Sequence, residues 1–224
     1  MWIENSIKRS KKLRKHYKLH DIDIFIKDNL PEFVDPNYVF LYVAKRISSH
    51  LLKGVDIIYV GKFANLEKKG ANALYEDGAI YITNTQDDEM DMIDDVVHEI
   101  AHSNEKIYQD IIYGDGRLES EFKAKRNTLY KLLTDQYKIK TPPSLVHSID
   151  YREDLEDFLY DTVGYNILNR AVTGLFTSTY STVSIKEYFA RGFEHYFLGQ
   201  KRELKEISPI LYDIIETLDS LEDN

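Results

Sequence analysis

The chain has 224 residues, a formal net charge of −9 and a hydrophobic content of 43%. These values exclude an intrinsically disordered protein and provide enough apolar residues for one substantial core. Cysteine is absent from the sequence, which excludes disulfides, thiolate metal ligands and a cysteine nucleophile. Because no apolar run approaches the ~20 residues of a spanning helix, we expect no membrane span.

The first 20 residues differ in charge from the rest of the chain. They contain seven Lys or Arg and one Glu, a net charge of +6, so residues 21–224 carry −15. Residues 1–20 are predicted to be a basic arm or helix that could contact an acidic partner; a solvated helix face is the commoner outcome for such a segment. For the acidic main body we do not expect nucleic acid as a partner.

The basic segment is not followed by the apolar stretch of a secretory signal. We therefore expect a soluble, intracellular protein. Secretion by a non-classical route and an origin in a phage or mobile element stay open.

The N-terminal half contains short strand-like and helical segments. The predicted elements are an alternating acidic and apolar segment at 21–26, a buried helix at about 37–52 and strands at 55–60 and 78–84. Residues 61–78 are predicted to be a loop that could include one helical turn. As a sheet edge near Ile80–Thr83, the last strand could pair with an extended peptide. As an interior strand it would bind no ligand, and the sequence leaves both alternatives open.

The next helix carries the most informative pattern in the chain, His98-Glu99-Ile100-Ala101-His102. On an α-helix the two histidines lie on one face, one turn apart, so both imidazoles can reach a single Zn²⁺. Glu99 points beside the metal and could take a proton from a zinc-activated water. The alternative is an amphipathic core helix whose histidines simply pack. The spacing favours zinc.

The C-terminal half is predicted to be helical. The expected helices cover about 117–138, 150–172, 185–198 and 203–218, with a Ser/Thr/Gly-rich loop at 173–184. Together with the two predicted strands, this indicates an α+β, mainly helical fold with a small sheet packed on the helix of the H-E-x-x-H motif. We expect a single catalytic domain at 21–224.

A catalytic zinc site needs a third protein ligand. The metzincin continuation H-x-x-G-x-x-H does not occur, because Glu105 and Tyr108 occupy its positions. The best candidate is Glu187, in the first turn of the helix after the Ser/Thr loop. Ser184-x-x-Glu187 is equally a capping box that would use this carboxylate to begin the helix, and spacing alone does not decide. The reserve candidates are Glu119, Glu121 and His195.

Two stretches together resemble a known family. His98-Glu99-x-x-His102 and the later Glu187-Tyr188-Phe189-Ala190-x-x-Phe193 are similar to gluzincins of the anthrax-lethal-factor type, which include the small Pro-Pro endopeptidases. The resemblance covers about residues 78–102 and 180–198. It implies a zincin-like fold, Glu187 as the third zinc ligand, and Tyr180 as a residue that binds the substrate carbonyl as it becomes an oxyanion. The segment between His102 and Glu187 is longer than the resemblance leads us to expect, which implies a helical insertion at about 117–172.

The sequence departs from the family four residues after Glu187. The family has there a carboxylate that orients a zinc histidine, whereas this chain has Arg191. We therefore expect another acid to take that role, with Glu194, Asp94 and Asp95 as candidates.

These observations support two functional hypotheses. The first is a zinc endopeptidase that acts on a peptide or protein substrate, with His98, His102 and Glu187 as zinc ligands, Glu99 as general base and Tyr180 at the oxyanion. The second is a non-catalytic zincin-like structural or interaction protein whose basic arm binds nucleic acid or another acidic partner.

Overall fold

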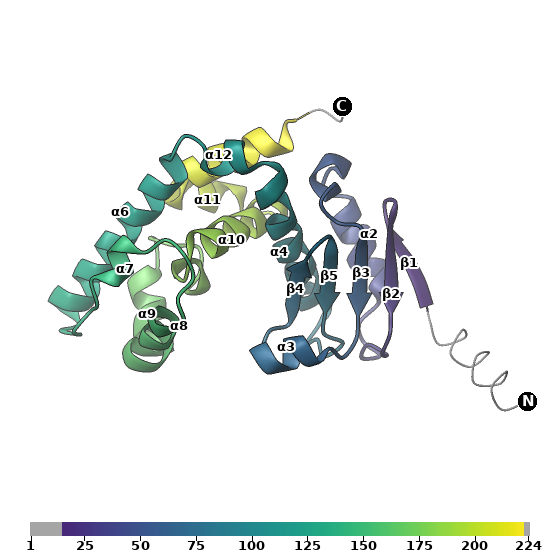
Figure 1. Cartoon of the computed structure of the whole chain (residues 1–224), viewed down its shortest axis with the longest axis horizontal. Helices are drawn as coiled ribbons and strands as arrows, with labels where there is room; N and C mark the ends of the chain where they lie inside the picture. Colours follow the sequence, from purple (N-terminus) through teal and green to yellow (C-terminus); the bar gives the residue numbers. More distant parts are fainter. Residues whose placement is uncertain (1–14, 222–224) are drawn as a thin grey trace, which may run out of the picture. The chain divides into compact units, whose positions relative to one another are not determined.

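The computed structural model describes residues 15–221, which form two compact units (Figure 1). One unit extends to Ile107, and the other comprises Tyr108–Leu221. The chain combines many helices with a five-stranded sheet, so the predicted α+β, mainly helical class is confirmed. Most of the predicted basic arm, residues 1–14, lies outside the described residues. The single catalytic domain and its insertion stay predictions.

The first unit contains the sheet. Its elements are β1 (Lys15–Leu19), β2 (Ile22–Ile26), α2 (Pro36–Ala44), the 3-10 helix η1 (Ser49–Leu52), β3 (Ile57–Val60), α3 (Ala64–Lys69), β4 (Ala73–Glu76), β5 (Ala79–Ile82) and α4 (Glu89–Ile107). The strand order is β1-β2-β3-β5-β4. The central strands β2, β3 and β5 are parallel, and each edge strand is antiparallel to its neighbour. The end of the predicted arm is therefore a strand.

The two faces of the sheet differ because successive side chains of a strand point to opposite sides. One face carries aliphatic side chains, which are fully buried at Ile24, Ile58 and Ile80. The other face carries a ladder of stacked rings from Phe25, Tyr59 and Tyr81. Helix α4 packs against β4 and β5, and α2 packs against α4 and β1. The sheet thus supports the helix that carries the H-E-x-x-H motif.

Strand β4 corrects the predicted position of the sheet edge. Of the two alternatives for the strand near Ile80–Thr83, the structure shows the interior strand, because β5 lies between β3 and β4, and the alternative of a sheet edge was wrong. The true edge is β4, within the segment predicted as a loop. Its sequence signal is Asp77-Gly78, with φ values of +45° and +86°. Such a two-residue turn with positive φ joins two antiparallel strands.

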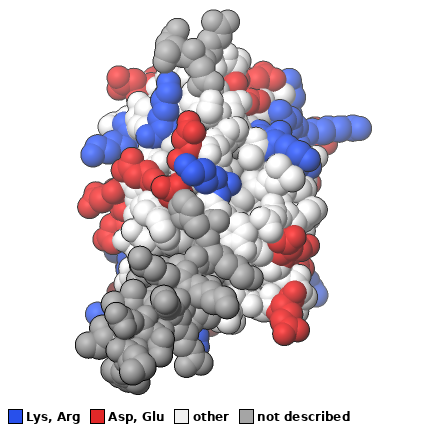
Figure 2. All heavy atoms as spheres, turned by 90° about the vertical axis from the view of Figure 1, so that its right-hand side faces the viewer, with Lys and Arg blue, Asp and Glu red and all other residues white. Residues whose placement is uncertain are grey.

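Charged side chains of both signs are interspersed over the face drawn in Figure 2. In the first unit, Lys18 pairs with Asp23 at 3.2 Å and Lys27 with Asp28 at 3.8 Å, and all four side chains are exposed. Exposed pairs of this kind contribute at most about 1 kcal/mol each. The stability of this unit therefore comes mainly from its aliphatic core.

The second unit is helical throughout its regular structure. Its elements are α5 (Gln109–Tyr113), α6 (Arg117–Lys131), the π-helix η2 (Leu132–Gln136), α7 (Ser144–His147), α8 (Glu153–Asp157), the π-helix η3 (Phe158–Gly164), α9 (Tyr165–Val172), the 3-10 helix η4 (Tyr180–Thr182), α10 (Ile185–Phe197), α11 (Lys201–Ile207) and α12 (Pro209–Asp219). The predicted last helix is divided in two, because Pro209 starts a new helix after Ser208. Within the described residues, no helix combines the length and hydropathy of a membrane span.

Helix α10 is the centre of the second unit. It packs against α6, α11, α12 and η4. At its contact with α12, a Cβ on Gly192 would clash with the buried side chain of Leu211 and force it to shift. The rigid packing of α10 fixes the segment that carries Glu187.

A buried guanidinium fixes the chain just before α10. Arg126 on α6 is fully buried, and it donates hydrogen bonds to the carbonyl oxygens of Ser148, Thr182 and Val183. Burial lowers the pKa of Arg126 to about 10, so the side chain stays charged at neutral pH. One side chain thus holds two separate segments of backbone.

We expect Arg126→Met to lower the free energy of unfolding by roughly 3–5 kcal/mol, since it leaves three carbonyl groups without this donor. Urea unfolding followed by circular dichroism measures the change. Lys123→Met on the same helix is the control, because Lys123 pairs with Glu119 at the surface. Equal effects of the two substitutions would contradict the role given to Arg126.

Candidate metal centre

Helix α4 places the two motif histidines side by side. Its N-terminus is capped by Asp88, whose Oδ1 accepts a hydrogen bond from the Asp91 N–H at 2.9 Å. Two turns further on, His98 Nε2 and His102 Nε2 lie 3.1 Å apart. Their rings are 4.8 Å apart between centroids and nearly perpendicular. The helix therefore points one nitrogen of each ring at a common position.

The separation of these nitrogens suits one zinc ion. Zinc–imidazole bonds are about 2.0–2.1 Å long. Two such bonds with their nitrogens 3.1 Å apart enclose an angle of about 98°, close to tetrahedral coordination. Little movement of the pair is needed to hold a metal.

A carboxylate on the same helix orients the second histidine. Glu105 Oε1 lies 2.6 Å from His102 Nδ1, and Glu105 is buried. A proton on Nδ1 bonded to this carboxylate leaves the lone pair of Nε2 for a metal. Glu105 was not among the acids predicted for this role. Its position three residues after His102, on the same helix face, is the sequence signal that could have found it.

Two of the acids predicted for this role, Glu194 and Asp95, also accept hydrogen bonds from other side chains. Glu194 is buried and accepts a hydrogen bond from Arg191 Nη1 at 2.8 Å. Asp95 Oδ2 accepts a hydrogen bond from Gln86 Nε2 at 3.1 Å. The residue that departs from the family, Arg191, thus forms an ion pair with an acid on its own helix.

The motif carboxylate Glu99 is held by the edge strand. Its side chain is only 6% exposed. The main-chain N–H of Tyr75 on β4 donates a hydrogen bond to Glu99 Oε2 at 2.6 Å. A hydrogen bond to the charged form of a carboxylate stabilises that form. The bond fixes the orientation of the Glu99 carboxylate.

Glu187 lies in the first turn of α10. The Ser184 hydroxyl accepts a hydrogen bond from the Glu187 N–H at 3.2 Å, so Ser184 caps the helix as predicted. This hydrogen bond of the capping box uses the backbone N–H of Glu187 and does not use its carboxylate.

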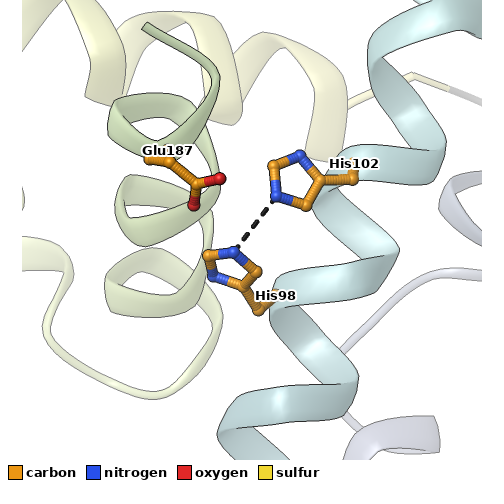
Figure 3. A group of neighbouring side chains, drawn as sticks. All are labelled: His98, His102 and Glu187. Atoms are coloured by element: carbon orange, nitrogen blue, oxygen red, sulfur yellow. Dashed lines mark hydrogen bonds between the residues drawn. The ribbon is translucent and has the colours of Figure 1, made fainter. Parts of the chain in front are cut away.

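Figure 3 draws His98, His102 and Glu187 as neighbouring side chains. Each residue offers one ligand atom, and these atoms lie within 4.8 Å of one another. A search of the described residues for three or more neighbouring His, Asp or Glu side chains that could hold a metal ion finds this group alone. Two imidazoles and one carboxylate are a typical ligand set of catalytic zinc.

The reserve ligands have structural roles within the second unit. Glu121 accepts hydrogen bonds from the Tyr188 hydroxyl and from the first N–H groups of α12. Glu119 pairs with Lys123 at the surface. Burial lowers the pKa of His195, which lies in the last turn of α10.

Tyr180 is in the 3-10 helix η4, just before α10. Burial raises the pKa of its hydroxyl, and the nearby carboxylates of Glu187 and Glu156 raise it further. The guanidinium of Arg191 lies 5.7 Å from the centre of its ring. At neutral pH Tyr180 is therefore an uncharged hydrogen-bond donor.

Asp95 precedes the motif by one helical turn. Burial raises its pKa from 3.8 to about 7, the hydrogen bond from Gln86 opposes the change, and the charges of Asp91 and Glu99 add to it. Between about pH 4 and pH 7 the folded protein holds a proton that the unfolded chain has released. The free energy of unfolding therefore falls as the pH rises through this window.

We expect Asp95→Asn to stabilise the protein more at pH 8 than at pH 5, by roughly 2–3 kcal/mol, because asparagine cannot take the buried charge. Urea unfolding in the presence of a chelator at both pH values measures this. The exposed Asp161, changed to asparagine, is the control. An identical effect of Asp95→Asn at the two pH values would show that burial of its charge is not the cause.

Comparisons of the chain with protein-family models, curated proteins and solved structures gave no match. The resemblance to gluzincins therefore depends on the residues quoted for it.

Proposed function

We propose that the protein is a zinc-dependent endopeptidase with a zincin-like fold, in which His98, His102 and Glu187 bind the metal. The observation that carries the proposal is the pair of Nε2 atoms 3.1 Å apart on α4, next to the buried carboxylate of Glu99. The group formed with Glu187 (Figure 3) and the orientation of His102 by Glu105 support it. Packed core histidines would need none of these neighbours.

A zinc ion bound by these ligands would polarise both a water molecule and the scissile carbonyl. The residues of the chain supply the rest of the chemistry. Glu99 accepts the proton of the attacking water and later delivers it to the leaving amine. Tyr180, protonated at neutral pH, donates a hydrogen bond to the developing oxyanion, where one such donor contributes roughly 2.7–4 kcal/mol.

The substrate backbone is expected along β4. At the base of the β4–β5 hairpin, the Thr83 N–H donates a hydrogen bond to the carbonyl oxygen of Asn72, so the backbone of Asn72 faces β5. The N–H of Tyr75 points away from β5, toward Glu99. Because residues alternate along a strand, Ala73 also presents its N–H and C=O at the outer edge. An extended peptide could pair there and bring its scissile bond close to Glu99.

Metal content and peptidase activity test the proposal together. We expect about one zinc ion per chain by mass spectrometry, and cleavage of peptides from a mixed-sequence library. Removal of zinc by a chelator should abolish cleavage, and added zinc should restore it. A protein that binds no zinc in excess metal, or that cleaves equally well without it, would contradict the proposal.

A further inference from the structure

Tyr75 makes two hydrogen bonds that join three parts of the first unit. Its N–H bonds to Glu99 Oε2 at 2.6 Å, and its hydroxyl donates to the carbonyl oxygen of Gly54 at 2.9 Å. The first bond reaches α4, and the second reaches the segment just after η1. Both ends of the same residue are therefore fixed.

The segment that receives the hydroxyl is itself anchored on α4. Asn104 is fully buried, and its Nδ2 donates to the carbonyl oxygen of Leu51 at 2.8 Å. Gly54 lies so close to α4 that a Cβ there would meet the carbonyl oxygen of Ser103 at 2.6 Å. Only glycine permits this approach without a shift of the backbone. The carbonyl of Gly54 is thus fixed relative to the helix that carries Glu99.

These contacts form a closed path: α4 anchors Gly54, Gly54 binds the Tyr75 hydroxyl, and the Tyr75 N–H binds Glu99 on α4. Without the hydroxyl, the neighbours of residue 75 on β4 would keep their hairpin pairing with β5, but residue 75 would lose its tie to Gly54. Strands at a sheet edge have one unsupported side, and they open more readily than central strands.

We propose that Tyr75 is a positioning residue for Glu99: its hydroxyl, fixed by Gly54, holds the edge strand so that its N–H orients the carboxylate. The inference rests on the proposed function for its effect on catalysis, whereas the structural effect on the Tyr75 amide does not. A misplaced general base lowers the rate of the chemical step and leaves substrate affinity unchanged.

The test is Tyr75→Phe, which removes only the hydroxyl. In ¹⁵N-labelled, zinc-loaded protein, the amide hydrogen of residue 75 should exchange with solvent at least about tenfold faster than in wild type. On a cleaved peptide, kcat should fall about tenfold while zinc content stays unchanged. Tyr81→Phe, on the neighbouring strand β5, is the matched control and should change neither quantity.

Gly54→Ala tests the same path from its other end. The added methyl group displaces the Gly54 carbonyl, so the variant should also accelerate exchange at the Tyr75 amide. Combined with Tyr75→Phe, it should add little further loss, because both substitutions break the same connection.

The outcomes separate this inference from the proposed function. Faster exchange in Tyr75→Phe supports the positioning role even if the wild type cleaves no peptide, a result that would reject the peptidase alone. Unchanged exchange and unchanged kcat in Tyr75→Phe would overturn the positioning role while leaving the peptidase intact. A fall in kcat with unchanged exchange would also overturn it, since the hydroxyl would then act by another route.

Discussion

Glu99→Gln is expected to lower kcat by about 10²–10⁴-fold without loss of zinc, the range typical of a general acid–base group. Glutamine has nearly the same shape, and its oxygen can still accept the hydrogen bond from the Tyr75 N–H. It cannot take a proton from water. The substitution therefore separates chemistry from folding and metal binding, and steady-state kinetics with metal analysis measures both.

The exposed Glu67 on α3, changed to glutamine, is the control for Glu99 and should leave the kinetics unchanged. Glu99→Ala should lose activity to a similar extent, and it should also lose the bond to the edge strand. Peptidase activity that survives in Glu99→Gln would reject the general base, whatever the zinc content.

Glu187→Ala is expected to weaken zinc binding more than about 100-fold. The loss of a carboxylate that merely supports a ligand histidine costs 10–100-fold, and a direct ligand should cost more. The start of α10 should survive the change, because Ser184 bonds to the backbone N–H of residue 187. Competition with a zinc chelator of known affinity measures the effect, and circular dichroism checks the helix content.

Glu119→Ala is the matched control for Glu187, since Glu119 was a reserve ligand that pairs with Lys123 at the surface. It should bind zinc like the wild type. If Glu187→Ala binds zinc with unchanged affinity while His98→Ala does not, the histidine pair holds metal with another third ligand, and the proposed ligand set fails.

The local pattern around the motif was sufficient to predict α4. Apolar residues at helical spacing predicted the helix, and the four-residue separation predicted that His98 and His102 share a face. The same periodicity brings the two rings close enough for their Nε2 atoms to lie 3.1 Å apart. Even Glu105, which the sequence analysis overlooked, lies within one turn of His102. Such short-range geometry is contained in the helix itself.

The edge strand shows where local patterns were insufficient. The segment 61–78 is polar and contains glycine, so it predicted a loop, yet Ala73–Glu76 forms β4. Its Asp77-Gly78 turn is a local signal that could have been recognised. The local sequence does not predict which strand lies at the edge. That depends on the pairing of β3 with β5, which are separated by many residues.

The sequence by itself determined the mainly helical α+β class, the helix of the motif and the common face of its two histidines, because these depend on spacing within a single element. Only the tertiary structure decided that β4 is the sheet edge, that Tyr75 contacts both Glu99 and Gly54, and that Arg126 binds carbonyl groups far along the chain. These contacts join residues 20 to 60 positions apart. Their formation depends on how the elements pack around a core. Periodicity along the chain identifies single elements, and it does not specify which elements pack together.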